Sequence, residues 1–397
     1  MTKVIIISAI SSKLILAKNN TDMKKVYFLT SIIFLAIHSF VFAQNQPKVH
    51  GRIQYDVEAM KRTSDTAWMV GSEFRRVHLS FGGQLADNLR YKVEVNFAYG
   101  KIGFRDVYIK YLSRWGIFGI GAIAEPTGIA MATSSKYIPL AERPMLTSLQ
   151  NFRWGAGLHY ANYSLLSRHL GIQAALTGNG KNGEGFLDKH LERGLNFSAR
   201  LFGYIPFVIA DHRYGLHLGL NGASRPVADL HFRPENHLGE KYAYVFPGAK
   251  RRLVWGGETA LLLRGFSLRG EYKTQNMPAT GQSDFNVSGM YVTAGVLLTG
   301  EKYRMKHGGF TRIVPQYPVS DEGWGAWEIL VRFSQMKVND AVKAVNPQMP
   351  EGINTYSLGL NWYPEARVRL MYNFTLTRDG LSQGPLQAHI FRVQVDF

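Results

Sequence analysis

The sequence contains no cysteine among its 397 residues, which excludes disulfide bonds and thiolate metal sites. After residue 43 it also lacks any apolar run long enough for a membrane-spanning helix. If the chain crosses a membrane, it must do so with strands, because only helices and closed barrels pair every backbone polar group in lipid. Acidic residues are comparatively few, with 29 against 46 lysines and arginines and a formal charge of +17.

Sequence motifs of catalysis are missing as well. The 12 histidines are scattered without metal-ligand spacing, and no Gly-x-Ser-x-Gly elbow occurs. The glycine-rich residues 178–180 lack the Lys-Ser/Thr of a phosphate-binding loop. We therefore expect neither an enzyme nor a bound cofactor. A basic chain with many aromatics is also compatible with nucleic-acid binding, but no recognition motif is present and the export signal described next argues against it.

The first 43 residues have the features of a targeting sequence. Lys24 and Lys25 form a short basic region, residues 26–40 are mostly apolar, and Ala43 precedes Gln44. This is the pattern of a secretory signal peptide that is cleaved after Ala43. We assign residues 23–43 to that signal, residues 1–22 to an upstream mis-start or an extended leader, and residues 44–397 to a single mature domain.

Polar and apolar residues alternate with a period of two through most of the mature chain. In residues 89–97, Tyr91 and Val93 share one face while Lys92 and Glu94 share the other. Such alternation predicts strands with one apolar and one polar face. We count about sixteen strands, in the ranges 49–57, 73–81, 89–97, 104–111, 116–124, 152–161, 169–177, 194–202, 214–221, 253–263, 266–273, 287–299, 326–337, 354–362, 367–376 and 387–397, with a weak extra strand at 242–246.

Strands of this number, length and spacing predict an all-β protein, namely a transmembrane antiparallel β-barrel of the bacterial outer membrane. In residues 73–81, strict alternation places Arg75 on the apolar face and Arg76 on the polar face. The final strand ends on Phe397, and such an ending resembles the signal by which the barrel-assembly machinery of outer membranes accepts its substrates. An ordinary edge strand, or a soluble β-sandwich in two or more copies, is the alternative interpretation.

If the apolar faces meet outer-membrane lipid, the polar faces line a pore, and these faces carry more cations than acids. Rings of Arg and Lys attract anions, and the guanidinium fork suits phosphate or carboxylate oxygens. The alternatives are a mixed-charge lumen that only keeps the pore wet, or cations at the rim that bind lipopolysaccharide phosphates. The candidate pore-lining, anion-guiding residues are Arg52, Arg76, Arg90, Lys92, Lys110, Lys136, Arg143, Arg332, Arg369 and Arg392.

Several short stretches occur together in a characteristic order from about residue 49 to the end. They are Gly51-Arg52-Ile53-Gln54-Tyr55-Asp56, Phe74-Arg75-Arg76, Phe104-Arg105-Asp106-Val107-Tyr108-Ile109, Glu125-Pro126, Thr133-Ser134-Ser135-Lys136-Tyr137-Ile138, Ala141-Glu142-Arg143, Thr299-Gly300-Glu301-Lys302-Tyr303-Arg304, Gly325-Ala326-Trp327-Glu328 and Leu358-Gly359-Leu360-Asn361-Trp362-Tyr363-Pro364. As a set they resemble the phosphate-selective porin O and P family. The resemblance implies a sixteen-stranded, homotrimeric outer-membrane channel whose third loop folds inward and narrows the pore.

The function expected from these features is a passive, anion-preferring diffusion channel, with phosphate or polyphosphate among the candidate solutes. A non-selective general porin is the alternative, and so is an outer-membrane barrel with an enzymatic or structural role. An enzyme such as a barrel phospholipase needs a Ser and a His on the outer face near the rim, and we see no convincing pair.

Residues 125–150 break the strand pattern between two good strands, and long loops inside compact domains are usually functional. We expect this segment to be the inward-folded constriction loop that the resemblance implies. Its cations Lys136 and Arg143 would then meet Arg76 and Lys110 at the narrowest point, where a transient anion relieves the repulsion between like charges. The alternative is that Lys136 and Arg143 pair with Glu142 and Asp106 and fix the loop to the wall.

Overall fold

The computed structural model describes residues 47–100, 102–149, 154–178, 194–210, 212–239, 241–281 and 283–397. The leader proposed for residues 1–43 lies outside the described residues. No helix in these described ranges has the length and apolar character needed to cross a membrane.

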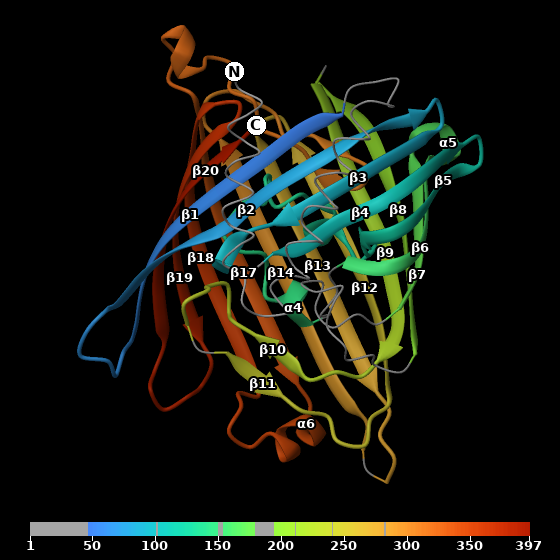
Figure 1. Cartoon of the computed structure of the whole chain (residues 1–397). Helices are drawn as coiled ribbons and strands as arrows, with labels where there is room; N and C mark the ends of the chain where they lie inside the picture. Colours follow the sequence, from blue (N-terminus) through green and yellow to red (C-terminus); the bar gives the residue numbers. More distant parts are fainter. Residues whose placement is uncertain are drawn as a thin grey trace, which may run out of the picture.

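Sixteen antiparallel strands close into one barrel (Figure 1). They are β1(Lys48–Arg62), β2(Met69–Ala86), β3(Leu89–Asn96), β4(Gly103–Ser113), β5(Gly116–Ala124), β6(Trp154–Ser164), β7(Leu170–Gly178), β8(Leu195–Ile209), β9(His212–Pro226), β12(Arg251–Leu263), β13(Phe266–Met277), β14(Phe285–Leu297), β17(Ala326–Val338), β18(Gly352–Glu365), β19(Val368–Arg378) and β20(Leu386–Asp396). The predicted all-β barrel of about sixteen strands is confirmed, and each predicted strand overlaps one of these, although several observed strands, such as β1, β2 and β8, are longer than predicted.

Short elements occupy the connections between the barrel strands. They are α3(Ile129–Ala132), α4(Leu146–Leu149), α5(Leu165–Arg168), α6(Asp340–Val345), η1(Ala98–Gly100), η2(Val319–Asp321) and the two small hairpins β10(Leu230–Phe232) with β11(Tyr242–Tyr244) and β15(Met305–Lys306) with β16(Gly309–Phe310). The weak extra strand predicted at 242–246 is β11, which lies outside the barrel sheet.

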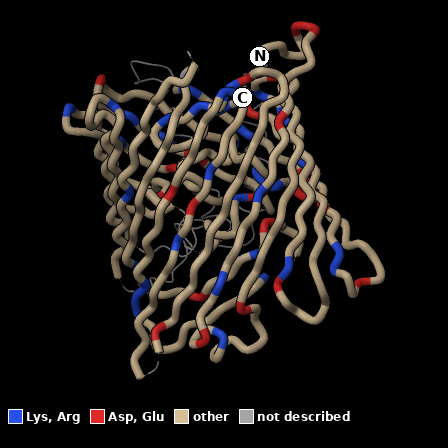
Figure 2. The backbone as a smooth tube through the Cα atoms, turned by 180° about the vertical axis from the view of Figure 1, so that it is seen from behind, with Lys and Arg blue, Asp and Glu red and all other residues tan. Residues whose placement is uncertain are grey.

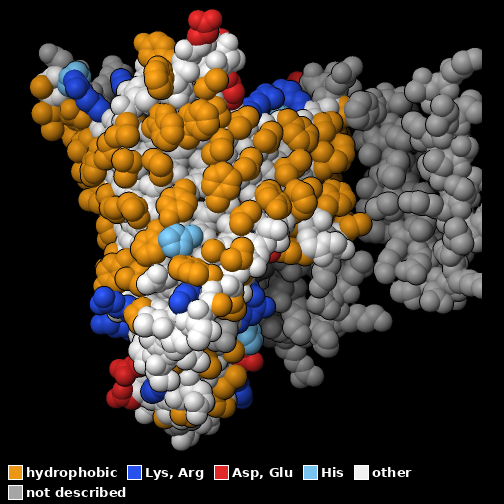
Figure 3. Space-filling view, turned by 90° about the vertical axis from the view of Figure 1, so that its left-hand side faces the viewer, with side chains coloured by type: hydrophobic (Ala, Val, Ile, Leu, Met, Phe, Trp, Pro, Cys, Tyr) orange, Lys and Arg blue, Asp and Glu red, His pale blue; other side chains and the backbone are white. Residues whose placement is uncertain are grey.

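The alternating pattern places apolar residues outside and polar residues inside. On β1, Arg52 and Asp56 are buried whereas Ile53 and Tyr55 are 41% and 37% exposed. This inverts the arrangement of a soluble protein, because lipid surrounds the outer face of an outer-membrane barrel. Hydrophobic side chains accordingly form a broad band over the outer face (Figure 3).

A β-bulge in β2 changes which arginines face the interior. Gln54 pairs with Arg76 and the next residue of β1 pairs with Phe74, so Arg75 is an extra residue without a partner on β1. A bulge lets two successive side chains turn to the same side. Both guanidinium groups bond inward, that of Arg75 to Glu142 and that of Arg76 to Gln54. The prediction that Arg75 lies on the apolar face is therefore wrong.

The barrel is closed by β1 and β20, which pair from Arg52 with Asp396 to Arg62 with Leu386. Two further backbone bonds join Gly51 and Phe397 at 2.8 and 3.1 Å. The Phe397 ring covers Gly51 so closely that a Cβ atom there would overlap the ring. A glycine thus lets the terminal aromatic ring lie flat on the first strand.

The connections differ between the two ends of the barrel. We call the end at which β1 begins and β20 ends the terminal end (Figure 1). Most of its connections are short turns, such as residues 87–88 and 366–367, but residues 298–325 form a long one. At the opposite end the longest described connections are residues 125–149 and 227–250. Residues 125–149, 227–250 and 298–325 each send side chains or backbone into the interior.

Candidate functional site

Residues 125–149 fold into the barrel and bond to its inward-facing side chains. Arg369 on β19 donates to the carbonyl oxygen of Pro139 at 2.9 Å, and the backbone N–H of Ala141 donates to Asn373 Oδ1 at 2.5 Å. Both strand residues are buried. This shows the inward fold expected of the segment, while its role as the narrowest point stays a prediction.

The same segment also contacts the wall at β1 and at β13. The Gln54 side chain donates to the carbonyl oxygen of Ser135 at 3.2 Å. At the start of α3, the backbone N–H of Ala130 donates to Glu271 at 2.6 Å, and Lys273 donates to the carbonyl oxygen of Thr127. Contacts with opposite sides of the barrel hold the segment across the lumen.

A second inward segment, within residues 227–250, meets the first. The Glu235 carboxylate accepts from Arg332 at 3.2 Å and from Ser357 at 3.1 Å, both on the barrel wall. It also accepts from the backbone N–H of Met145 at 3.2 Å. Glu235 therefore joins two loops to β17 and β18.

A third segment enters from the terminal end, within residues 298–325. The carbonyl oxygen of Gly308 accepts from Arg200 at 2.7 Å, and the backbone N–H of Phe310 donates to Thr133 at 3.1 Å. Arg312 forms an ion pair with Asp396 on the last strand. The β15–β16 hairpin thus reaches the loop that enters from the other end.

Sequence reasoning missed the second and third segments as parts of the interior. The signal available for each was a gap in the strand pattern, at residues 222–252 and 300–325. A gap reveals the length of a connection but not the direction in which it folds.

Five of the candidate cations hold the structure together. Arg392 forms two hydrogen bonds with Asp56, at 2.5 and 2.6 Å, and is fully buried. Arg332 and Arg369 bind the two loops as described above. Lys92 pairs with Glu94 at 2.5 Å and Asp106 at 2.8 Å, and Lys136 pairs with Asp396 at 3.6 Å. The charge of these groups is largely matched, or their donors are taken up by loop carbonyls.

The remaining five candidate cations form fewer or longer ion pairs. Among the described residues, Arg76, Arg90, Lys110 and Arg143 make no ion pair within 4.0 Å. For Arg52 the nearest acid is Glu94 at 4.0 Å, and its guanidinium lies 2.5 Å from His78 Nδ1. Arg90 is exposed, near the terminal end of β3. Four of these five cations therefore have no ion-pair partner among the described residues.

Arg143 does not form the ion pair that was expected of it. Its Nη2 donates to the carbonyl oxygen of Thr133 at 2.9 Å, within the same loop, and its buried Nη1 has no hydrogen-bond partner. Burial and the nearby Arg52 lower the pKa of Arg143 to about 10, although Glu142 opposes the shift. The group stays charged at pH 7.

The prediction that Lys136 and Arg143 pair with Glu142 and Asp106 to fix the loop to the wall is wrong. Glu142 pairs with Arg75 at 2.8 Å and Arg392 at 3.2 Å, while Asp106 pairs with Lys92. Lys136 therefore binds neither of the acids expected for it, and pairs instead with Asp396. The carboxylate of Glu142 was the correct anchor for the loop, but the cations that hold it come from the wall.

Solvent reaches one side of the interior more than the other. The inward side chains Arg76, Lys92 and Lys110 are half-buried, on β2, β3 and β4. The inward side chains Arg269 and Arg369 on the other side of the barrel are buried, with 4% and 3% exposed. The loops contact β1, β2, β8 and several strands from β13 to β20, whereas the inward cations Lys92 and Lys110 of β3 and β4 remain half-buried. Acidic residues are interspersed with the cations along the strands (Figure 2).

A closed sixteen-stranded barrel with an apolar outer band, a charged interior and loops folded inward defines an outer-membrane porin. The comparisons with known proteins agree with this class. The family model for phosphate-selective porin O and P matches residues 48–397. The chain belongs to that family, and it is an anion-preferring channel of the bacterial outer membrane, not an enzyme.

The similarity to individual proteins is distant in sequence. Porin O of Pseudomonas aeruginosa is 23% identical over 379 residues, covering 81% of each chain. An anion-selective porin from Comamonas acidovorans is similar in fold, with a TM-score of 0.56, 11% identity and coverage of 89% of this chain and 99% of that one. A trimer form of OmpT from Vibrio cholerae has a TM-score of 0.52, 11% identity and coverage of 89% and 99%.

Proposed function

We propose that the channel conducts small inorganic anions such as phosphate along the wall formed by β2, β3 and β4, past Arg76 and Lys110 and beside Arg143 of the loop. The observation that carries the proposal is the unmatched charge of these three groups. A guanidinium without a carboxylate partner attracts an anion, and its fork suits phosphate oxygens.

The neighbouring cations support transient rather than tight binding. Lys92 is neutralised by two acids, and the Lys110 ammonium lies 4.0 Å from the centre of the Tyr108 ring. Conduction requires sites that attract an ion and then release it to the next one. Cations that have no paired acid and lie along a half-buried wall provide such sites, because a passing anion has no bound carboxylate to displace.

A general porin with little selectivity is the second candidate. It is favoured by the mixed cluster of Lys92, Glu94 and Asp106, which carries two acids against one cation along the same wall. The two candidates differ in the reversal potential under a salt gradient. A general porin gives a value near zero, and an anion channel gives a clear offset.

The test is a planar-bilayer measurement on the wild type and on Arg143→Gln. One unit charge at 4 Å contributes about 1 kcal/mol even in water, which corresponds to about fivefold in relative affinity. We expect the anion-to-cation permeability ratio to fall by about that factor and phosphate to block chloride current less. The control is Arg114→Gln, since Arg114 is exposed in the turn between β4 and β5. Unchanged selectivity in Arg143→Gln refutes this path.

We also propose how the protein is exported and assembled. Residues 23–43 act as the signal peptide, and both ends of the mature chain face the periplasm, because an even strand number returns the chain to its starting side. The terminal strand ending in Phe397 is the element that the barrel-assembly machinery recognises. Three copies associate side by side through part of the apolar outer face, and outer-membrane lipid and lipopolysaccharide cover the rest.

A further inference from the structure

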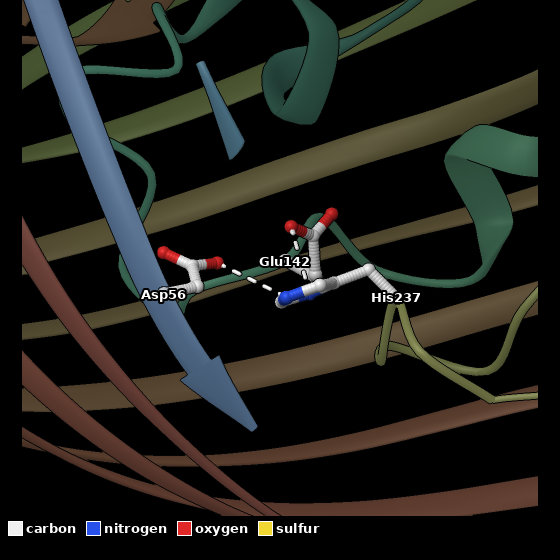
Figure 4. A group of neighbouring side chains, drawn as sticks. All are labelled: Asp56, Glu142 and His237. Carbon is white, nitrogen blue, oxygen red and sulfur yellow. Dashed lines mark ion pairs between the residues drawn. The ribbon is translucent and has the colours of Figure 1, made fainter. Parts of the chain in front are cut away.

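A buried histidine in the interior and the carboxylates beside it come from separate parts of the chain. His237 belongs to residues 227–250, Asp56 to β1 and Glu142 to the loop 125–149, and the three side chains converge in Figure 4. Their nearest ligand atoms all lie within 4.8 Å of one another. We propose that Asp56, Glu142 and His237 bind a divalent transition-metal ion of the zinc class.

The lack of hydrogen-bond partners for the buried imidazole is the second observation that indicates a ligand. His237 is 9% exposed, and neither ring nitrogen has a hydrogen-bond partner. Nε2 lies 3.3 Å from Asp56 Oδ2, and Nδ1 lies 3.8 Å from Glu142 Oε1. Buried polar groups are normally hydrogen-bonded, so this ring is positioned toward acids without a satisfied bond to any of them.

The local charge also calls for a cation. Four carboxylates lie within 4.0 Å of the ring, those of Asp56, Glu58, Glu73 and Glu142. At the same cutoff their guanidinium partners are Arg75 and Arg392. One oxygen of Glu58 is buried without a hydrogen-bond partner. A neutral imidazole offers a lone pair to a metal ion.

The donor set indicates the class of metal. An imidazole nitrogen with carboxylate oxygens suits zinc, whereas calcium and magnesium prefer oxygen ligands alone. Ligand bonds of about 2.0–2.1 Å place two ligands of a tetrahedral zinc about 3.3 Å apart. The two contacts of His237 involve different ring nitrogens, Nε2 with Asp56 at 3.3 Å and Nδ1 with Glu142 at 3.8 Å, so an ion bound to one nitrogen requires the other carboxylate to move toward it. The carboxylate oxygens that face His237 also accept from arginines, Asp56 Oδ2 from Arg392 and Glu142 Oε1 from Arg75 and Arg392, so the metal would share these oxygens with the guanidinium groups.

A metal here would link the wall to both loops that enter from one end. Its ligands come from the first strand, the loop 125–149 and the segment 227–250, which are far apart in sequence. Binding to the folded protein alone stabilises it by mass action. The zinc-bound protein should therefore unfold at a higher temperature than the metal-free protein.

The first experiment measures zinc binding by the purified full chain, prepared without a polyhistidine tag. We expect one zinc per chain in the wild type, at least a tenfold loss of affinity in His237→Gln, and no loss in His231→Gln. His231 is the matched control because it lies in the same segment and is exposed. Absence of stoichiometric zinc from the wild type, or unchanged zinc affinity in His237→Gln, overturns the proposal. Equal affinity for calcium also contradicts it, because calcium would not use the imidazole.

A second variant tests directly whether residue 237 binds the metal, and it does so even if His237→Gln folds poorly. The chain has no cysteine, so His237→Cys introduces its sole thiol. With Co²⁺ in place of zinc, a thiolate ligand adds an intense sulfur-to-cobalt absorption band in the near ultraviolet that the wild type lacks. We expect this band in His237→Cys and not in His231→Cys. Its absence from His237→Cys in folded protein shows that the metal is elsewhere.

Discussion

At the scale of single residues, the interior arginines fall into two groups, those bound to acids or to loop carbonyls and those with donors that have no partner. Arg392 is fully buried and bonds to Asp56 and to Glu142, and Arg332 joins Glu235 to Thr293. Arg143 has a buried guanidinium nitrogen without a partner. Residue type alone did not separate these two groups, because they differ only in the acid or carbonyl that each guanidinium bonds to across the barrel.

The first residue-scale prediction concerns Arg392. Replacing it with Met leaves Asp56 buried without its partner, and breaking a buried pair from one side costs about 3–5 kcal/mol. We expect Arg392→Met to lower the unfolding midpoint in urea and to increase current noise, because the loop 125–149 loses one anchor. Arg90→Met is the control, since Arg90 is exposed. Equal midpoints for the two variants would show that Arg392 does not hold the loop.

A second residue-scale prediction separates the two loop cations. Lys136 is paired with Asp396, whereas Arg143 has no acid partner among the described residues. Lys136→Gln should therefore change the reversal potential less than Arg143→Gln does, by at least a factor of two. The measurement is the same salt-gradient recording. A larger effect of Lys136→Gln would place the anion path at the terminal end, beside Asp396.

At the scale of elements, the junction of the first and last strands depends on a close approach. The Phe397 ring lies against Gly51, and a Cβ there would overlap it. Aromatic cover over a strand glycine is a recognised way to fix register. The alternating residues of the last strand indicated its two faces, but not that a particular glycine accommodates the ring.

We predict that Gly51→Val weakens barrel closure. The added branch must displace the ring, and overpacking of this kind costs about 1–3 kcal/mol. The heat-modifiable folded band in electrophoresis should convert at a lower temperature than in the wild type. Gly203→Ala is the control, because a Cβ there has only an ordinary contact at 3.5 Å. Restoration by the double variant Gly51→Val, Phe397→Ala would identify the ring as the cause, and failure of restoration would contradict it.

The β15–β16 hairpin gives a second element-scale prediction. It enters from the terminal end and contacts Arg200 and Thr133. Replacing residues 303–313 with a short turn should raise single-channel conductance, because an element that occupies the interior is removed. Shortening residues 319–323 is the control, since η2 has no buried residue. Conductance that is unchanged in the hairpin variant would show that the ion path bypasses this region.

At the scale of the whole molecule, the barrel has two distinct ends. The terminal end contains the start of β1 and the end of β20, and the other end contains α6 and the β10–β11 hairpin (Figure 1). An even number of strands places both termini at one end, and most connections at that end are short turns, which are typical of the periplasmic side, so the terminal end should be periplasmic.

Single-cysteine labelling tests this orientation, since the chain has no cysteine of its own. Thr66→Cys lies in the exposed connection between β1 and β2, and Ser320→Cys lies at the terminal end. A thiol reagent too large to pass the pore should label Thr66→Cys on intact cells. It should label Ser320→Cys only after the outer membrane is opened. The reverse pattern would invert the proposed topology.

The sequence by itself determined the strands and the identity of their faces. Period-two alternation is a local property of one strand. In a barrel each strand has one face toward lipid and one toward the interior, so the sides of residues such as Ile53 and Arg52 can be predicted without knowing which strands are their neighbours. The break at residues 125–150 likewise marked a loop. All sixteen barrel strands could be placed on this basis.

Only the tertiary structure decided what fills the barrel. The bulge at Arg75 arises from its pairing with β1, and the positions of Glu235, His237 and Arg312 depend on partners from about 80 to 180 residues away. Alternation is satisfied within one strand, but an ion pair between a loop and a distant wall leaves no periodic trace in the sequence. For this reason the outer face of this porin was predictable from its residues, and the partners of its interior cations were not.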